Sequence, residues 1–311
     1  RILRAASSVV SRNRARKEKE LWTRRELGEE LELLEAKDER EEAGLIDSAI
    51  REEARSRGRS LRDFVVLYRI NAQSRALEEA FRIRGMPYLL VGGTRFYERK
   101  EVKDVLAYLK VIANPSDSLS LTRIMNVPRR GIGEKSAARL SAFALSRSLS
   151  LYEAMGKAEE VEGLSPGVKS RLLAFHQLLE RYRNWAEGVS AHELVTQLMD
   201  DTGYLQGMAE EGAVETESRI ENVKELLVSI ANFSRDSEDP SLDSYLAKVS
   251  LFTEIDGWDN REEAVTLMTA HNAKGLEFPV VFISGLEDGV FPHASSLSSL
   301  EELEEERRLF Y

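Results

Sequence analysis

The stretch VTLMTAHNAKGLEFPVVFISGLEDGVFP, residues 265–292, carries the strongest structural pattern in the chain. Two apolar runs, residues 265–269 and 280–286, predict two strands. The polar turn between them holds His271, Lys274 and Glu277. Since ligands of open α/β sheets bind where the strands end, we expect these side chains at one binding edge of a sheet. A buried strand pair with a polar connection explains the pattern equally well.

The composition is that of a folded protein with two domains. Its 311 residues, 42% of them hydrophobic, can build a sizeable core. No run of 18 apolar residues occurs, so no membrane span is expected, and the first ten residues lack the apolar core of a signal peptide. Without cysteine there are no disulfides or thiolate metal sites, which fits a cytoplasmic protein. Because the chain begins without Met and stops at Tyr311 after an acidic helical segment, we expect a fragment.

Charge is distributed unevenly along the chain. The net charge of −10 argues against a nucleic-acid partner, but the distribution is more informative. Residues 1–25 carry a local charge of +7 and residues 95–147 one of +6, whereas residues 200–263 carry −12. This asymmetry permits a basic face on an acidic protein, although an ordinary solvated surface is the simpler interpretation.

The hydrophobic pattern predicts two kinds of structure. The expected order in the first part is strand 31–35, helix 38–57, strand 63–69, helix 72–84 and strand 88–91. Alternating strands and helices are typical of a parallel sheet. Helical periodicity then fills residues 98–250, with expected helices near 102–112, 118–126, 134–147, 166–187, 191–201, 215–233 and 241–250. We therefore predict a discontinuous α/β domain, residues 1–94 and 260–311, interrupted by an all-α domain at 95–259.

Residues 66–75, VLYRINAQSR, place two functional side chains at a strand end. Arg69 can offer forked donors and a permanent charge to a ligand phosphate. Tyr68 beside it can stack on a flat base. Asn71 is placed to cap the helix that follows. A surface arginine next to a tyrosine at the edge of the core is the alternative.

Two stretches of the helical block have features of DNA binding. Basic residues alternate with Phe96 and Tyr97, which suits a nucleic-acid backbone with stacked bases: Arg95, Arg99 and Lys100. Residues 126–140, NVPRRGIGEKSAARL, resemble a helix-hairpin-helix, in which glycines and helix N–H groups approach a phosphate. The predicted contacts of this hairpin are Arg129, Arg130, Gly131, Gly133 and Lys135. A glycine-rich turn between two core helices is the alternative.

These stretches together resemble a known family. Residues 265–292 resemble motif V of the superfamily 1 DNA helicases of the UvrD/Rep/PcrA type, and residues 66–75 resemble their motif IV. The final residues, LEELEEERRLFY, are similar to the start of motif VI. The resemblance covers nearly the whole chain. It implies the second RecA-like domain, a P-loop NTPase type of fold, with an inserted helical domain called 2B.

The resemblance also implies roles for individual residues. Arg69 would contact the γ-phosphate of ATP in the manner of an arginine finger, Tyr68 would pack on the adenine, and Glu277 would bind the ribose. The motif V residues implied to touch single-stranded DNA are Thr269, His271 and Lys274. The hairpin is implied to contact duplex DNA.

The same resemblance predicts what the chain lacks. No G-x-x-x-x-G-K-[ST] phosphate loop occurs, so the magnesium ligands and catalytic carboxylate are expected on a missing N-terminal RecA-like domain, and no metal ligand is expected here. The predicted function is the C-terminal part of an ATP-dependent 3′–5′ DNA helicase in DNA repair or replication, inactive by itself. The alternatives are a non-catalytic DNA-binding or regulatory module and the helicase subunit of a helicase–nuclease complex.

Overall fold

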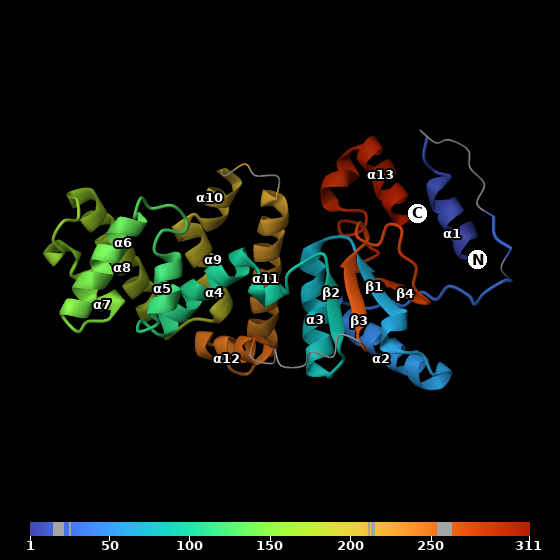
Figure 1. The fold of residues 1–311 in the computed structure, drawn as a ribbon, viewed down its shortest axis with the longest axis horizontal. Helices are drawn as coiled ribbons and strands as arrows, with labels where there is room; N and C mark the ends of the chain where they lie inside the picture. Colours follow the sequence, from blue (N-terminus) through green and yellow to red (C-terminus); the bar gives the residue numbers. More distant parts are fainter. Residues whose placement is uncertain (15–21, 25, 211, 213–214, 254–262) are drawn as a thin grey trace. The chain divides into compact units, whose positions relative to one another are not determined.

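The computed structural model describes residues 1–14, 22–24, 26–210, 212, 215–253 and 263–311. The chain forms two compact units, Arg1–Arg95 with Gly257–Tyr311 and Phe96–Asp256. The first unit contains the sheet and the second is helical (Figure 1). The predicted domain boundaries lie between residues 94 and 95 and between residues 259 and 260. The second of these boundaries lies outside the described residues.

A four-stranded, fully parallel sheet forms the centre of the first unit. Its strands are β1 (Phe64–Tyr68), β2 (Tyr88–Val91), β3 (Val265–Thr269) and β4 (Val280–Ile283). Their order is β2-β3-β1-β4, so β1 lies between β3 and β4. The expected α/β class with a parallel sheet is confirmed. The two apolar runs of motif V are not partners of each other, because each pairs with β1.

Strand alternation explains how this sheet is covered. Phe64, Val66 and Tyr68 of β1 share a buried cluster with Val265 and Leu267 of β3. Residues of α2 (Glu39–Arg57) and α3 (Ser74–Ile83) complete the same cluster, so both helices pack on one face. Because side chains alternate between faces, Val65 points to the opposite side, where it is also buried.

The two ends of the sheet unit meet. In α1 (Ile2–Val10) the chain begins as a short helix, and α13 (Leu300–Phe310) is the last one. The Asn13 amide, just after α1, donates to the carbonyl of Glu304 at 2.8 Å, and Arg307 donates to the Asn13 oxygen at 3.2 Å. This buried amide links residues about 290 positions apart.

Two local predictions for the sheet unit are wrong. Residues 31–35 form no strand; they are exposed and bond to no strand of the sheet. Asn71 does not cap α3, because it lies inside a short 3₁₀ turn, Asn71–Gln73. The N-cap of α3 is Gln73, whose side chain makes no capping bond to the helix; its oxygen accepts instead from the backbone N–H of Arg69 at 2.9 Å and of Ile70 at 3.0 Å, which fixes the corner after β1.

The helical unit is built around one helix. Its elements are α4 (Lys100–Ala113), α5 (Ser118–Ile124), α6 (Glu134–Ser146), α7 (Leu151–Gly156), α8 (Pro166–Ala186), α9 (Ala191–Thr202), α10 (Tyr204–Glu210), α11 (Thr216–Asp236) and α12 (Leu242–Thr253). Most side chains of α4 are buried, so it fills the centre. The predicted helices all occur; the short α7 and α10 were not predicted. None of the described helices is long and apolar enough to cross a lipid bilayer.

A buried polar network ties α4 to α11. Asn222 donates to Glu101 at 2.6 Å and accepts from Arg99 at 2.7 Å. Arg219 approaches the same Glu101 carboxylate at 3.9 Å. Burial without such partners would be costly for these polar groups, so Arg219 and Asn222 of the segment ETESRIEN serve internal packing.

Arg75 provides a test of how the sheet unit is held together. Its side chain is fully buried and pairs with Glu79 and Glu39, each at 3.1 Å. Replacing Arg75 with Ala leaves Glu79 buried without this cation, so we expect the free energy of unfolding to fall by about 3–5 kcal/mol. Urea unfolding followed by circular dichroism measures this. The exposed Arg55 is the matched control: Arg55→Ala should cost under about 1 kcal/mol. Equal costs for both variants would contradict the assignment.

Candidate functional site

The ends of β1 and β3 lie side by side. Tyr68 pairs with Thr269 in the sheet register, and the backbone N–H of Ala270 donates to the Tyr68 carbonyl at 2.7 Å. Arg69 directly follows Tyr68, and His271 directly follows Ala270. The predicted adjacency of motifs IV and V is therefore confirmed, although about two hundred residues separate them in sequence.

Arg69 is held by a carboxylate of α13. Its Nε lies 2.9 and 3.0 Å from the two carboxylate oxygens of Glu306, and its Nη2 lies 2.7 Å from Oε1. The pair is largely buried, with 19% of the Arg69 side chain and 6% of the Glu306 side chain exposed. The backbone N–H of His293 donates to Glu306 at 3.1 Å. Burial opposes the effect, but Arg69 and this N–H together lower the pKa of Glu306, which keeps it a carboxylate.

His271 lies in the field of the same pair. Partial burial, together with the positive charge of Arg69, lowers the pKa of His271, while Glu306 and Glu305 oppose the shift. The neutral imidazole is therefore favoured near pH 7. At this pH His271 offers a hydrogen-bonding ring and not a fixed cation.

The other predicted residues of this edge are placed differently. Tyr68 is 1% exposed, so in this arrangement its ring offers no face to a base; its stacking role stays a prediction that requires the ring to be uncovered. Thr269 is 9% exposed, and its hydroxyl accepts from the turn N–H of Asn272 at 3.4 Å. Lys274 and Glu277 are exposed. Glu277 lies on the segment returning to the start of β4, away from the strand end that Arg69 follows.

Asn272 fastens the turn that carries His271. Its side-chain amide donates to the carbonyl of Val91 at 3.4 Å and lies over Gly92. A Cβ on Gly92 would come within 2.1 Å of that amide, and the φ of Gly92 is +75°, so glycine is required there twice over. The turn therefore depends on a residue at the end of β2.

The predicted hairpin lies between α5 and α6 of the helical unit. The Asn126 side-chain oxygen accepts from the backbone N–H of Arg130 at 2.8 Å and of Ile132 at 3.1 Å. Ile132 is 2% exposed and anchors the turn in the core. Gly131 has a φ of +69°, and Gly133 forms the N-cap of α6. Because α6 begins here, its first N–H groups face out of the turn, as phosphate binding requires.

Two arginines predicted to bind DNA have partners inside the helical unit. Arg130 donates to the carbonyls of Ile124 and Val127, each at 2.9 Å, and its guanidinium lies 4.1 Å from the ring centre of Phe175. Arg99 is 7% exposed and bonds to Asn222. Both guanidinium groups therefore contribute to internal packing, and their binding of DNA stays a prediction.

The remaining basic candidates of the helical unit are accessible. Arg129, Lys135 and Lys100 are exposed. Arg95, at the end of the sheet unit, is half-buried. These four positions keep their predicted role.

Arg171 is a candidate that sequence reasoning missed. It lies on α8 and is exposed, and a Cβ on Gly131 would come within 3.0 Å of its Nη1. Among the described residues it makes no hydrogen bond or ion pair. Arg171 therefore adds a free guanidinium beside the glycine turn. Because forty positions separate Arg171 from Gly131 in the sequence, their proximity follows only from the packing of α8 against the turn.

Comparison with known proteins identifies the family of this chain. A family model described as the UvrD-like helicase C-terminal domain matches residues 1–311. The chain belongs to this family. It is 42% identical to the ATP-dependent DNA helicase PcrA of Bacillus subtilis and of Staphylococcus aureus, and 40% identical to that of Staphylococcus epidermidis. Each alignment covers 100% of this chain and 43% of the relative, so the chain spans less than half the length of these proteins.

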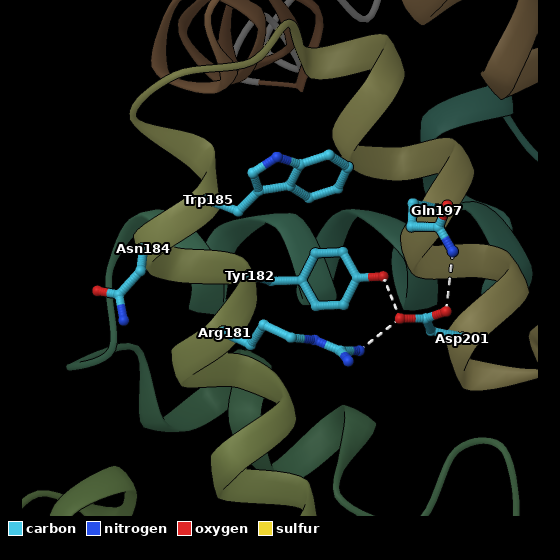
Figure 2. A pocket seen from close by; sticks show the side chains of 6 residues that line it. All are labelled: Arg181, Tyr182, Asn184, Trp185, Gln197 and Asp201. Carbon is cyan, nitrogen blue, oxygen red and sulfur yellow. Dashed lines mark hydrogen bonds and ion pairs between the residues drawn. The ribbon is translucent and has the colours of Figure 1, made fainter.

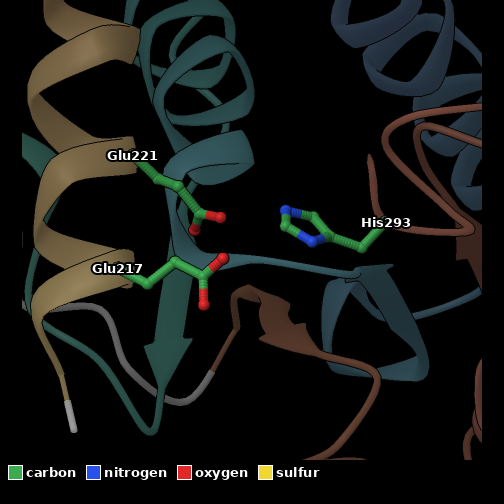
Figure 3. Close-up of side chains that lie close together, drawn as sticks. All are labelled: Glu217, Glu221 and His293. Carbon is green, nitrogen blue, oxygen red and sulfur yellow. The ribbon is translucent and has the colours of Figure 1, made fainter. Parts of the chain in front are cut away.

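In the part of the UvrD-like chain that the structure describes, neither unit holds a complete metal site. Among the described residues, no three His, Asp or Glu ligand atoms of one unit gather within 4.8 Å. Glu217 and Glu221 lie one turn apart on α11 with their carboxylates on the same side (Figure 3). Two carboxylates alone are too few oxygen ligands for a hard cation. His293, also labelled in Figure 3, belongs to the sheet unit, where its Nδ1 lies 2.8 Å from Ser295 Oγ.

A surface pocket between α8 and α9 is lined by side chains that bond the two helices to each other. Asp201 accepts from Tyr182 at 2.8 Å and from Gln197 at 2.9 Å, and it pairs with Arg181 (Figure 2). Trp185 packs edge-on against Tyr182, 5.8 Å between ring centres. Since the polar groups satisfy one another across the two helices, this pocket in the UvrD-like domain is explained by packing.

The lowered pKa of His271 gives a direct test. In an NMR titration, the imidazole should titrate below the ordinary value of 6.5. Its protonation disfavours the folded state, so its contribution to stability is lost as pH falls below that value. Arg69→Ala removes the positive charge and should raise the midpoint. Arg55→Ala is the control and should leave it unchanged. A midpoint above 6.5 in the unaltered chain would contradict this account.

The reassignment of Arg130 predicts a stability effect. Arg130→Ala removes one of the donors to the carbonyls of Ile124 and Val127 and the contact with Phe175, so we expect a loss of about 2–4 kcal/mol in unfolding free energy. Arg129→Ala, at the exposed neighbour, should change it by less than about 0.5 kcal/mol. Chemical denaturation of both variants measures these losses. A larger loss for Arg129→Ala than for Arg130→Ala would contradict the structural role of Arg130.

Proposed function

We propose that this chain forms the C-terminal part of an ATP-dependent DNA helicase that moves 3′ to 5′ along one strand, in DNA repair or replication. The observation that carries the proposal is the Arg69 guanidinium at the carboxyl ends of parallel strands, where ligands of such sheets bind. Membership of the UvrD-like family and the name of the PcrA relatives agree with it.

The residues of the sheet edge fit the phosphate end of a nucleotide. Glu306 occupies the Nε and one Nη2 hydrogen of Arg69, and Nη1 bonds to no described residue. A γ-phosphate could accept from this free side of the fork. The predicted binding of the base by Tyr68 requires its ring to be uncovered, and the predicted binding of the ribose by Glu277 requires its segment to reach toward the nucleotide. ATP supplies the phosphoanhydride whose cleavage drives movement, and its Mg²⁺ would be held by the part of the protein that the chain does not cover.

DNA would meet both units. In the sheet unit, exposed His271 and Lys274 follow β3 and would contact the single strand, with Thr269 holding their turn. In the helical unit, the hairpin would hold the duplex through Arg129, Lys135 and Arg171 and the N–H groups at the start of α6. Such contacts grip the backbone without reading sequence. Arg95 and Lys100 would add charge.

The nucleotide proposal is tested by Arg69→Ala in the full-length protein. An arginine finger contributes to stabilising charge in the transition state, so we expect DNA-stimulated ATP turnover to fall by about 10³-fold. Arg55→Ala should retain it. Turnover that survives the loss of Arg69 would remove this residue from the reaction.

The hairpin proposal is tested by salt dependence. Arg129→Ala and Arg171→Ala should each weaken duplex binding and flatten the slope of log affinity against log salt by about 1, because each removes one phosphate contact. Arg183→Ala, further along α8, is the control, since its exposed side chain pairs with Glu180. Fluorescence anisotropy at several salt concentrations measures the slopes. Unchanged slopes for both variants would exclude the hairpin from the DNA path.

A further inference from the structure

The carboxylate of Glu306 accepts several hydrogen bonds at the sheet edge. It contacts Arg69 at two points through both carboxylate oxygens, and the His293 N–H fixes it from a third direction. Its neighbours on α13 do other things: Glu305 pairs with Arg308 at 2.6 Å and is 71% exposed. A two-point contact fixes the plane of a guanidinium, whereas a single contact leaves it free to rotate.

The geometry leaves part of Arg69 available. Arginine has five N–H donors, and Glu306 uses the Nε hydrogen and one on Nη2. Nη1 keeps both hydrogens without a partner among the described residues. The guanidinium is therefore clamped along one edge and open along the other. A phosphate can bind the open edge without displacing Glu306.

We propose that Glu306 is a positioning residue that clamps Arg69 so that its Nη1 edge faces the γ-phosphate of the nucleotide. This rests on the proposed function of Arg69. The carboxylate lies on α13, some 237 positions from Arg69 along the chain, so the orientation of the arginine depends on docking of the last helix. Glu306 itself does not touch the nucleotide.

The test is a double-mutant cycle in the full-length protein. Glu306→Gln keeps the shape of the side chain but loses the charge and one acceptor. We expect kcat for ATP hydrolysis to fall about 10-fold while KM for ATP changes by less than about 2-fold, because misorientation of Arg69 affects the transition state more than ground-state binding. In the Arg69→Ala background, Glu306→Gln should cause no further fall. Glu301→Gln, at an exposed position of the same helix, is the control.

Each outcome has one meaning. A fall in kcat of equal size in both backgrounds, or no fall with Arg69 intact, overturns the role of Glu306. If Arg69→Ala itself leaves turnover unchanged, the proposed function of Arg69 fails instead. Thermal melting checks folding. Should Glu306→Gln not fold, Glu306→Asp keeps the charge but shortens the reach, and the same cycle applies: kcat should fall only when Arg69 is present.

Discussion

The sheet unit depends on the backbone pairing between β1 and β3. These strands come from opposite ends of the chain, with the whole helical unit between them in sequence, and their register sets Tyr68 against Thr269. A shift by one residue would turn every side chain of β3 to the other face. Val265 and Leu267 would then leave the core, so burial of the strands also fixes the position of Arg69 relative to His271.

Arginine chemistry recurs across both units with different results. Arg75 is fully buried between carboxylates, and Arg130 lies among carbonyls and an aromatic ring. Arg69 is bound along one edge only, and Arg171 makes no bond to any described residue. The four guanidinium groups differ in the number of internal acceptors within their reach. This number depends on packing between helices that are distant in sequence.

Much of the fold follows from sequence, and less of the site does. The strands Tyr88–Val91 and Val265–Thr269 and the cap of α2 at Asp38 follow from local patterns, because burial and capping are local. The exposed stretch 31–35 alternates apolar and polar residues over its first three positions, but it has no neighbouring strand to bond. Arg99 and Arg130 look like DNA contacts in a basic sequence, yet their partners lie on α11 and α8. The positions of Glu306 and Arg171 could not be predicted, because each lies beside a residue that is distant in the sequence.

The position of Asn272 over Gly92 has a consequence for how this domain can vary. The two residues share one small volume: the amide fills the space that any side chain at 92 would need, and it is the amide that reaches the Val91 carbonyl. A side chain at 92 therefore requires the Asn272 amide to move. Among homologous sequences, glycine should therefore be kept at position 92 wherever asparagine occupies position 272, although 180 positions separate the two in this chain.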